Sequence, residues 1–482
     1  MTYPTQAPPP VPKKKRYVLR VIGVLCAGIF LLLILSIAIV SFSTLRTFAI
    51  RTAVSVMGAA PKRDSSGLTN ILLLGVGDKD HDAADLTDTM MIASIDSAKQ
   101  SIVLLSIPRD LYLTGNKTLR NGRINTLYSS AKAQTRAKYK KMEEADVIQI
   151  AIRDTAAEMS RKFEVEIHGV LIVDFTTVVE AVDALGGVDV VVSKDIVDYS
   201  YPVKEGVTGL FKLTKGPQHL DGETALKFAR SRHSGTDFDR SVRQQQLIRA
   251  LEEKVRSMNR FQQLGFVTSF YKSVTKHVQT NLKTVQLLGL AQLITSLSQE
   301  NVLMMQINFN YGGDNADAKA GGFLYSADSA QYEGANVLLP VTTDKDPTGW
   351  KQIRTYVWFL LHHPEIYFSD SEVQTVDASN QSLAAYRLLN EIRRYGFVTV
   401  PSPKIKPPVP KTKVPLLENS YITYRERKDK PLAYFFKNYL NIQTVSTQKV
   451  SDTTGTGSVR IVIGKDFKYR PFQMIGTGAV EE

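Results

Sequence analysis

An uncharged apolar run near the N-terminus constrains this chain of 482 residues more than any other feature. Residues 21–45 contain no charged side chain, and about 20 apolar residues suffice for a helix to cross a bilayer. Basic side chains precede the run at Lys13, Lys14, Lys15, Arg16 and Arg20. The positive-inside rule then predicts a cytoplasmic N-terminus. A cleaved signal peptide is the alternative, but its apolar core is usually only about 7–15 residues long. We therefore expect an uncleaved signal anchor in the cell membrane, single-pass, with the bulk of the chain extracytoplasmic.

The composition is that of ordinary folded domains, with 43% hydrophobic and 22% charged residues. The one cysteine, Cys26, excludes an intrachain disulfide and a cysteine-based metal site. We expect a cytoplasmic basic tail at 1–20, the transmembrane signal anchor at 21–45, a stalk at 46–67, a main domain at 68–363 with its core at 68–258, a small second domain at 370–467 and a tail at 468–482.

Short apolar runs alternate with segments of helical spacing in the main domain. Strand patterns occur at 70–76, 89–96, 101–108, 169–175 and 188–193, and helical spacing occurs at 141–163, 176–185 and 240–258. Strands that alternate with helices predict an α/β fold in which helices flank a mixed central sheet. Residues 370–467 repeat such a pattern on a smaller scale, which predicts a second small α/β domain.

Four arginines lie close together in the segment 228–251, at Arg230, Arg232, Arg240 and Arg243. If the chain is extended at the first two, they point the same way. Arginines in the first turn of a helix oppose the macrodipole, which is already positive at that end. Guanidinium groups and helix N-termini both suit phosphate oxygens, so the cluster indicates an anion site. A solvated, salt-bridged surface with Asp237 and Asp239 is the alternative.

Carboxylates and a further arginine stand at the ends of two predicted strands. Asp85 and Asp88 come directly before the strand at 89–96, and Arg109 follows the strand at 101–108. Strand ends are where α/β folds bind ligands. Carboxylate oxygens also suit Mg²⁺ beside a phosphate, although each of these residues alone could simply cap a strand end.

Taken together, these segments resemble the LytR-CpsA-Psr family of bacterial envelope proteins. The matching motifs, in chain order, are NILLLG, TDTMMIASID, VLLSIPRD, GRINTLYS, VDFTTVVEAVDALGGVDV, LDGETALKFARSRH and DFDRSVRQQQLI. The resemblance covers about 68–258 and continues loosely to about 363. Residues 370–467 resemble the LytR C-terminal-type domain that is often attached to this family.

The resemblance implies a membrane-anchored phosphotransferase. Such an enzyme moves a glycopolymer from a polyprenyl pyrophosphate carrier onto peptidoglycan or a similar cell-wall acceptor, and polyprenyl phosphate is released. The implied partners are the polyprenyl-linked glycopolymer, peptidoglycan and membrane lipid, and the implied cofactor is Mg²⁺ or Mn²⁺.

The resemblance also implies the site residues, by motif position. The implied catalytic residues are Asp88, Arg109 and Asp237. The implied pyrophosphate-binding residues are Arg109, Arg123, Arg230, Arg232, Arg240, Arg243 and Gln244. The implied metal ligands are Asp88 and Asp237. Gly77 stands where the family usually has an aspartate, so Asp78, Asp82 or Asp85 would have to substitute, or the metal would bind more weakly.

Two other functions stay open at this point. A hydrolase would use water as the acceptor, and the motifs do not specify the acceptor. A non-catalytic regulator of envelope assembly would have no need to collect Asp88, Arg109 and Arg230. The net charge of +13 and the pI of about 9.4 would suit nucleic acid. Because we expect the domains outside the cell, the charge instead favours anionic glycopolymers or lipid headgroups, and we expect no nucleic-acid partner.

Overall fold

The computed structural model describes residues 62–77, 85–117, 119–204, 207–231, 237–258, 277–287, 289–290, 301–309, 318–379, 382–400, 416–447 and 458–474. The expected tail and anchor, and most of the stalk, lie outside these residues. Among the helices that are described, none combines the length and apolar character needed to cross a membrane. Residues 62–283 and 291–482 form one compact unit, which the following description concerns.

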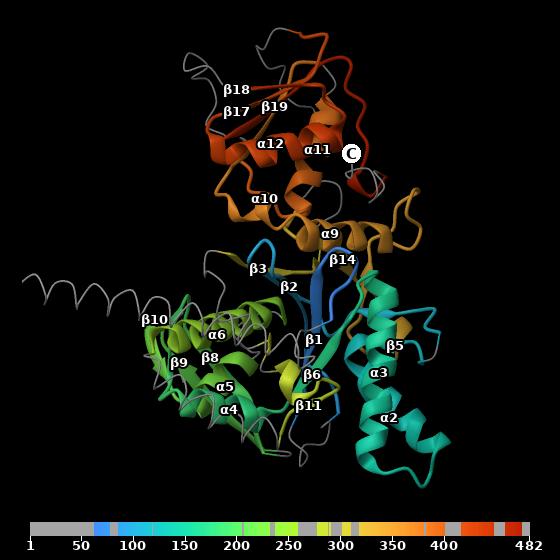
Figure 1. Ribbon diagram of the computed structural model, residues 1–482, viewed down its shortest axis with the longest axis vertical. Coiled ribbons are helices and arrows are strands. Elements are labelled where there is room, and N and C mark those ends of the chain that lie inside the picture. Colours follow the sequence, from blue (N-terminus) through green and yellow to red (C-terminus); the bar gives the residue numbers. More distant parts are fainter. Residues whose placement is uncertain are drawn as a thin grey trace, which may run out of the picture. The chain divides into compact units, whose positions relative to one another are not determined.

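A six-stranded mixed sheet forms the centre of this unit (Figure 1). Its strands, in spatial order, are β11 (Gln279–Thr280), β6 (Gly169–Val173), β1 (Leu68–Gly75), β2 (Thr89–Asp96), β3 (Ser101–Ser106) and β12 (Val302–Gln306). β1 and β3 each run antiparallel to β2, which lies between them, whereas β6 runs parallel to β1 and β12 parallel to β3. The fold is therefore a mixed α/β fold, and the strands expected at 89–96 and 101–108 are confirmed as the antiparallel pair β2 and β3.

Helices pack on this sheet because its strands are buried along almost their whole length. α2 (Leu127–Lys138) packs on α3 (Glu144–Phe163), and α3 contacts β6 and α9 (Trp350–His362). Ile152, Phe163 and Leu360 belong to the same buried core as Ile92 and Leu105 of the sheet. α4 (Phe175–Ala184), α5 (Gly222–Arg230) and α6 (Asp237–Ser257) form a second group, in which α5 contacts both of the others.

Local sequence signals set the ends of α4 and α5. The Asp174 side chain accepts a hydrogen bond from the backbone N–H of Thr177 at 2.8 Å, and Asp221 does the same for Thr224 at 2.8 Å. α4 ends at two glycines with left-handed backbone, Gly186 at φ 71° and Gly187 at φ 91°. These caps fix where each helix begins or ends beside the sheet.

Two antiparallel ribbons accompany α4–α6. One pairs β7 (Val188–Val192) with β10 (Gly216–Leu220), and the other pairs β8 (Ile196–Lys204) with β9 (Val207–Leu213). Their inward side chains form a second hydrophobic core with the helices. Smaller ribbons are β4 (Tyr112–Leu113) with β5 (Gly122–Arg123), and β13 (Asn308–Phe309), β14 (Gly322–Ser326) and β15 (Leu338–Pro340).

The C-terminal elements form a four-stranded sheet with two main helices. The strand order is β16 (Val373–Asp377), β19 (Val459–Ile463), β17 (Tyr421–Tyr424) and β18 (Thr444–Thr447), and the helices are α11 (Ser382–Arg394) and α12 (Lys430–Leu440). Phe359 of α9 packs edge-on against Phe435 at 5.1 Å and Tyr439 at 4.8 Å between ring centroids. One hydrophobic core thus continues from the central sheet through α9 into these elements.

Candidate functional site

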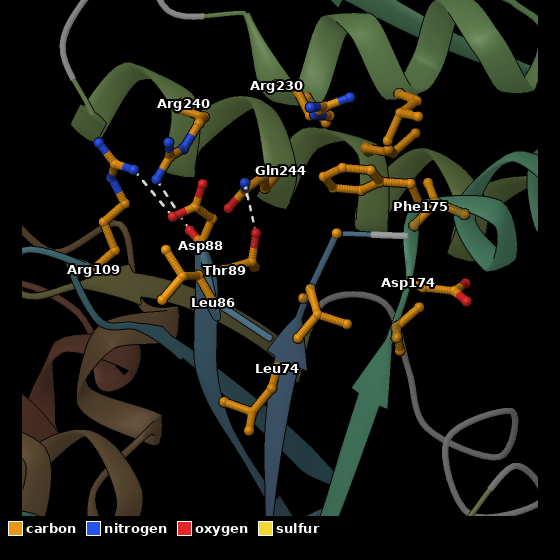
Figure 2. A pocket seen from close by; sticks show the side chains of 18 of the residues that line it. Leu74, Leu86, Asp88, Thr89, Arg109, Asp174, Phe175, Arg230, Arg240 and Gln244 are labelled. Atoms are coloured by element: carbon orange, nitrogen blue, oxygen red, sulfur yellow. Dashed lines mark hydrogen bonds and ion pairs between the residues drawn. The ribbon is translucent and has the colours of Figure 1, made fainter. Parts of the chain in front are cut away.

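A pocket of about 700 Å³ lies beside the C-terminal end of β1. Its walls come from β1, β2, the β6–α4 junction, β8, α5 and α6 (Figure 2). Most of the lining is apolar and comprises Leu73, Leu74, Val76, Leu86, Met91, Val173, Phe175, Val178, Leu226, Leu247, Ile248 and Leu251. The apolar face expected for the helix at 240–258 therefore lines this pocket as well as the core.

Charged and polar side chains gather at one end of the pocket, around Asp88. The Arg109 guanidinium donates from Nη1 to Asp88 Oδ1 at 3.0 Å, and Asn125 Nδ2 lies 3.4 Å from the same oxygen. The Asp88 side chain is 39% exposed, whereas that of Arg109 is 18% exposed. The Asp88 carboxylate is therefore open to the pocket, and the Arg109 guanidinium group that contacts it is the more buried of the two.

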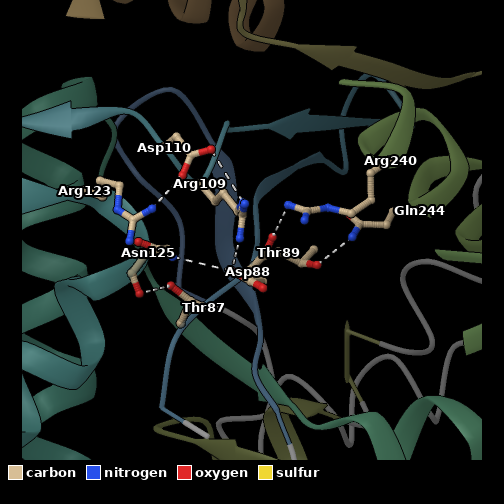
Figure 3. A network of polar contacts seen from close by, with 9 residues as sticks. All are labelled: Thr87, Asp88, Thr89, Arg109, Asp110, Arg123, Asn125, Arg240 and Gln244. Atoms are coloured by element: carbon tan, nitrogen blue, oxygen red, sulfur yellow. Dashed lines mark hydrogen bonds and ion pairs between the residues drawn. The ribbon is translucent and has the colours of Figure 1, made fainter. Parts of the chain in front are cut away.

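A second carboxylate, Asp110, forms ion pairs with both Arg109 and Arg123. Arg123 Nη1 donates to Asp110 Oδ1 at 3.2 Å, and Arg109 Nε lies 3.6 Å from Asp110 Oδ2 (Figure 3). Asp110 is only 9% exposed, so this carboxylate offsets part of the charge of both guanidinium groups in a protected position.

The first turns of α6 bring Arg240 and Gln244 to the same end. Arg240 Nη2 donates to the backbone oxygen of Asp88 at 3.0 Å, and Gln244 Nε2 donates to Thr89 Oγ1 at 2.8 Å. The two residues are four apart on one helix, so their side chains share a face. Figure 2 shows both pointing from α6 toward the start of β2.

Arg230 lines the pocket from the last turn of α5, where two aromatic rings hold it. Its guanidinium carbon lies 3.8 Å from the Phe175 ring centroid and 5.7 Å from that of Tyr201. Arg230 Nη1 also lies 3.4 Å from the Tyr201 hydroxyl. Burial raises the pKa of Tyr201, so this phenol stays neutral and can accept the hydrogen bond.

Arg230 differs from the sequence expectation in backbone conformation. α5 continues through Arg230, so the expectation of an extended chain from Arg230 to Arg232 is wrong at Arg230. A Lys and an Arg in the last turn favour the helix because they complement the negative end of its dipole.

Arg243 lies away from the pocket. It is 5% exposed and donates from Nε to the backbone oxygen of Phe228 at 2.8 Å, with a second bond to the backbone oxygen of Ser231. The sequence predicted that Arg243 contacts pyrophosphate, but its guanidinium instead binds carbonyl groups at the C-terminal end of α5. The three-residue offset from Arg240 explains the difference, because it turns the side chain about 60° away on the helix.

Several predicted residues lie outside the described part of the chain. Arg232, Asp78 and Asp82 belong to undescribed segments, and the side chain of Asp237 is not described. Asp85 is described, and its carboxylate receives a 2.6 Å hydrogen bond from Lys132. Asp85 therefore forms an ion pair with the buried side chain of Lys132.

The described residues contain no group of three histidine, cysteine or acidic side chains that could hold a metal ion. Asp88 is the one expected ligand whose side chain is described and faces the pocket. As an oxygen donor beside clustered arginines, it has the chemistry that Mg²⁺ prefers, but a complete ligand set needs further donors.

Three residues that line the pocket, Asn125, Phe175 and Asp198, were not predicted from the sequence, and neither was Tyr201, which contacts Arg230. Asn125 lies within the GRINTLYS motif, but an amide gives no charge signal. Phe175 and Tyr201 lie in apolar patterns that resemble ordinary core positions. Asp198 of β8 is 2% exposed and accepts a hydrogen bond from Ser231 Oγ at 2.9 Å, and no motif pointed to it.

Comparison with known proteins assigns the chain to a class. The family model described as the LytR_cpsA_psr family matches residues 42–335. This protein therefore belongs to the LytR-CpsA-Psr family, as the motifs predicted.

Particular relatives carry more specific names. The polyisoprenyl-teichoic acid–peptidoglycan teichoic acid transferase TagV of Bacillus subtilis (strain 168) is 25% identical over 266 residues, which are 54% of this chain and 61% of that relative. The transferase of the same description named TagU, from Bacillus mycoides (strain KBAB4), is 26% identical over 280 residues, which are 58% of this chain and 80% of that relative. The match to TagV thus spans less than two thirds of its length.

The crystal structure of B. subtilis TagV matches 62% of this chain and 98% of its own, with 22% identity and a TM-score of 0.43.

Proposed function

We propose that this protein transfers a glycopolymer from a polyprenyl pyrophosphate carrier to peptidoglycan or a similar cell-wall acceptor. The observation that carries the proposal is the division of one pocket into a long apolar wall and an arginine-bearing end. A polyprenyl pyrophosphate has the same division, because its hydrocarbon chain is apolar and its headgroup is anionic. Family membership and the transferase names of the relatives support the same reading.

The apolar wall would bind the prenyl chain by removing it from water. Each buried CH₂ group contributes about 0.8 kcal/mol to such binding. Side chains from α5 and α6 face those of β1 and β2 across the pocket, so a flexible hydrocarbon chain could be enclosed on several sides. A hydrocarbon chain forms no hydrogen bonds, and the apolar wall of the pocket offers few hydrogen-bonding groups.

The arginine-bearing end would bind the pyrophosphate and stabilise charge during transfer. An acceptor hydroxyl would attack the phosphorus attached to the sugar, and the bond from that phosphorus to the bridging oxygen would break. The glycopolymer would then be joined to the acceptor as a phosphodiester, with polyprenyl phosphate as the leaving group. Arg109, Arg230 and Arg240 would neutralise oxygens that gain charge in such a step, because phosphoryl transfer is catalysed mainly by positioning and by electrostatic stabilisation.

We further propose that Asp88 and Asp237 hold a Mg²⁺ or Mn²⁺ ion. The ion would supply positive charge at the phosphoryl oxygens. Asp88 Oδ1 is oriented by Arg109 and Asn125, so this carboxylate would be held in place before a ligand arrives. We also propose that the chain is anchored in the cell membrane by residues 21–45, with the pocket outside the cell, where lipid-linked substrates and peptidoglycan meet.

A transfer assay on the full-length protein tests the proposal. Purified protein in detergent micelles is mixed with a polyprenyl-pyrophosphate-linked oligosaccharide, peptidoglycan fragments and Mg²⁺, and released polyprenyl phosphate and joined product are both measured.

Arg240→Ala should lower turnover about tenfold or more, because it removes a charge-assisted contact of about 1.5–3 kcal/mol. Arg249→Ala, an exposed position on the same helix, is the matched control and should act as wild type. Asp88→Asn should reduce Mg²⁺-dependent turnover more than lipid binding.

The products separate the competing functions. Polyprenyl phosphate released without joined product would identify a hydrolase. Binding of the lipid without turnover in any divalent metal would identify a non-catalytic binder. Equal effects of Arg240→Ala and Arg249→Ala would remove the role given to the arginine-bearing end, and full activity of Asp88→Asn would remove the role given to the metal.

A further inference from the structure

The partners of Arg230 set it apart from Arg109 and Arg123, which also line the pocket. Arg109 pairs with Asp88 and Asp110, and Arg123 pairs with Asp110. Among the described residues, Arg230 has no carboxylate within ion-pair distance, and its contacts are with the side chains of Phe175 and Tyr201. Its positive charge is therefore held in place without being neutralised by an anionic side chain.

The geometry at Phe175 is that of a cation–π contact. A guanidinium carbon 3.8 Å from a ring centroid lies directly over the face of the ring. Such a contact uses the flat face of the guanidinium group, whereas hydrogen bonds leave from its edge. Figure 2 shows the guanidinium group of Arg230 near the ring of Phe175 at the wall of the pocket.

Three separate elements meet to make this contact. Phe175 is the first residue of α4, directly after the Asp174 cap, and Arg230 is the last residue of α5. Tyr201 comes from β8, is 4% exposed, and is itself supported by Phe211 of β9 at 5.8 Å between ring centroids. Because both rings lie on capped or paired elements, their positions do not depend on a ligand.

We propose that Phe175 and Tyr201 are positioning residues for Arg230, which they hold so that its N–H edge meets the anionic headgroup of the substrate. A carboxylate in their place would occupy the same donors and cancel the charge that the substrate needs. Aromatic faces restrict the side chain, whose free rotation would otherwise cost affinity, and leave those donors for phosphate oxygens. The inference rests on the proposed function, because it assumes that the ligand carries a pyrophosphate.

Binding of undecaprenyl pyrophosphate to the full-length protein in detergent micelles tests this inference. Phe175→Leu should weaken binding about threefold to thirtyfold, which corresponds to the usual strength of a cation–π contact. Phe175→Tyr should restore affinity, because the ring face is retained. Arg230→Ala should weaken binding at least as much as Phe175→Leu. In the Arg230→Ala background, Phe175→Leu should add almost nothing, because the two residues act through one contact.

A stability control separates positioning from a merely structural role. Phe163→Leu alters a buried ring that packs edge-on against Trp350 at 5.5 Å and does not line the pocket. It should lower the melting temperature without changing affinity, whereas Phe175→Leu should change affinity even where its melting temperature is kept.

The outcomes distinguish failure of the positioning role from failure of the proposed function. If wild type binds the lipid and Arg230→Ala weakens binding, but Phe175→Leu binds as wild type, the positioning role is overturned and the proposed function stands. Additive losses in the double variant would also overturn it. If wild type does not bind undecaprenyl pyrophosphate, the proposed function fails and this inference fails with it.

Discussion

Arginines of one sequence cluster have different roles here because their side chains meet different partners. Arg240 lines the pocket and donates to the backbone oxygen of Asp88, Arg230 stacks on a ring, and Arg243 donates to backbone oxygens at the end of α5. A guanidinium group is always charged in proteins, so burial makes its hydrogen bonds costly to lose. Position on the helix, and not residue type, separates Arg240, which lines the pocket, from Arg243, which does not.

Arg243→Met should destabilise the fold by about 2–4 kcal/mol, because two backbone oxygens at the end of α5 lose a charged donor. Urea unfolding measures this change. Arg249→Met on the same helix is exposed and should change stability by less than about 0.5 kcal/mol. A stable Arg243→Met variant with impaired lipid binding would instead give Arg243 a direct role in the pocket.

His168 should make the fold sensitive to acid. Its Nδ1 accepts a 2.9 Å hydrogen bond from the backbone N–H of Asn70, which only an unprotonated nitrogen can do. Burial lowers the pKa of His168 below its ordinary value of 6.5, although the nearby carboxylates of Glu166 and Asp64 oppose the shift. A lowered pKa contributes stability that is present above pH 6.5 and is lost as pH falls through the folded-state pKa.

The free energy of unfolding should therefore fall between pH 7.5 and pH 5, by at most about 1.4 kcal/mol per pH unit from this one group. His168→Asn keeps an acceptor near the same place but does not titrate, so its unfolding free energy should depend less on pH. Urea unfolding of both proteins at several pH values measures the difference. Parallel pH profiles would show that His168 does not contribute.

At the scale of elements, α9 packs against two parts of the chain that the sequence pattern predicted to be separate domains, 68–363 and 370–467. One side of α9 packs with the central sheet, and Phe359 packs on Phe435, Tyr439 and Phe472 of the C-terminal elements. The sequence placed the boundary at 363–370 because a second pattern of alternating strands and helices begins near 370. The packing of aromatic rings across that boundary has no sequence pattern of its own.

Removing the C-terminal elements should destabilise the remaining part. A chain that ends at Ser369 would expose Phe359 and its neighbours, and each large buried ring contributes about 3–5 kcal/mol. Size-exclusion chromatography and thermal unfolding should show aggregation or a lower melting temperature. A chain that ends at Met474 keeps every described C-terminal element and should match wild type. Wild-type stability of the shorter chain would show that the core divides at α9.

The sequence predicted regular elements better than it predicted the site. Strands such as 70–76 and helices such as 141–163 carry a clear period, so these elements could be predicted. The β8–β9 ribbon was missed because Ser200, Pro202 and Gly209 interrupt its alternation. In the site, Asp88 and the clustered arginines were found by their charge and spacing, whereas Asp198 stood in no motif, and Phe175 and Tyr201 could not be distinguished from core residues without the fold.

At the scale of the whole molecule, the central sheet contains neighbouring strands that are far apart in the sequence. β3 is flanked on one side by β2, its neighbour in sequence, and on the other by β12, where Ile102 pairs with Val302. During synthesis at about 5–20 residues per second, the outer edge of β3 would stay unpaired for roughly 10–40 s. An open strand edge invites pairing with other chains. The central sheet is therefore completed only after β12 emerges, and until then the open edge of β3 must be shielded from other chains.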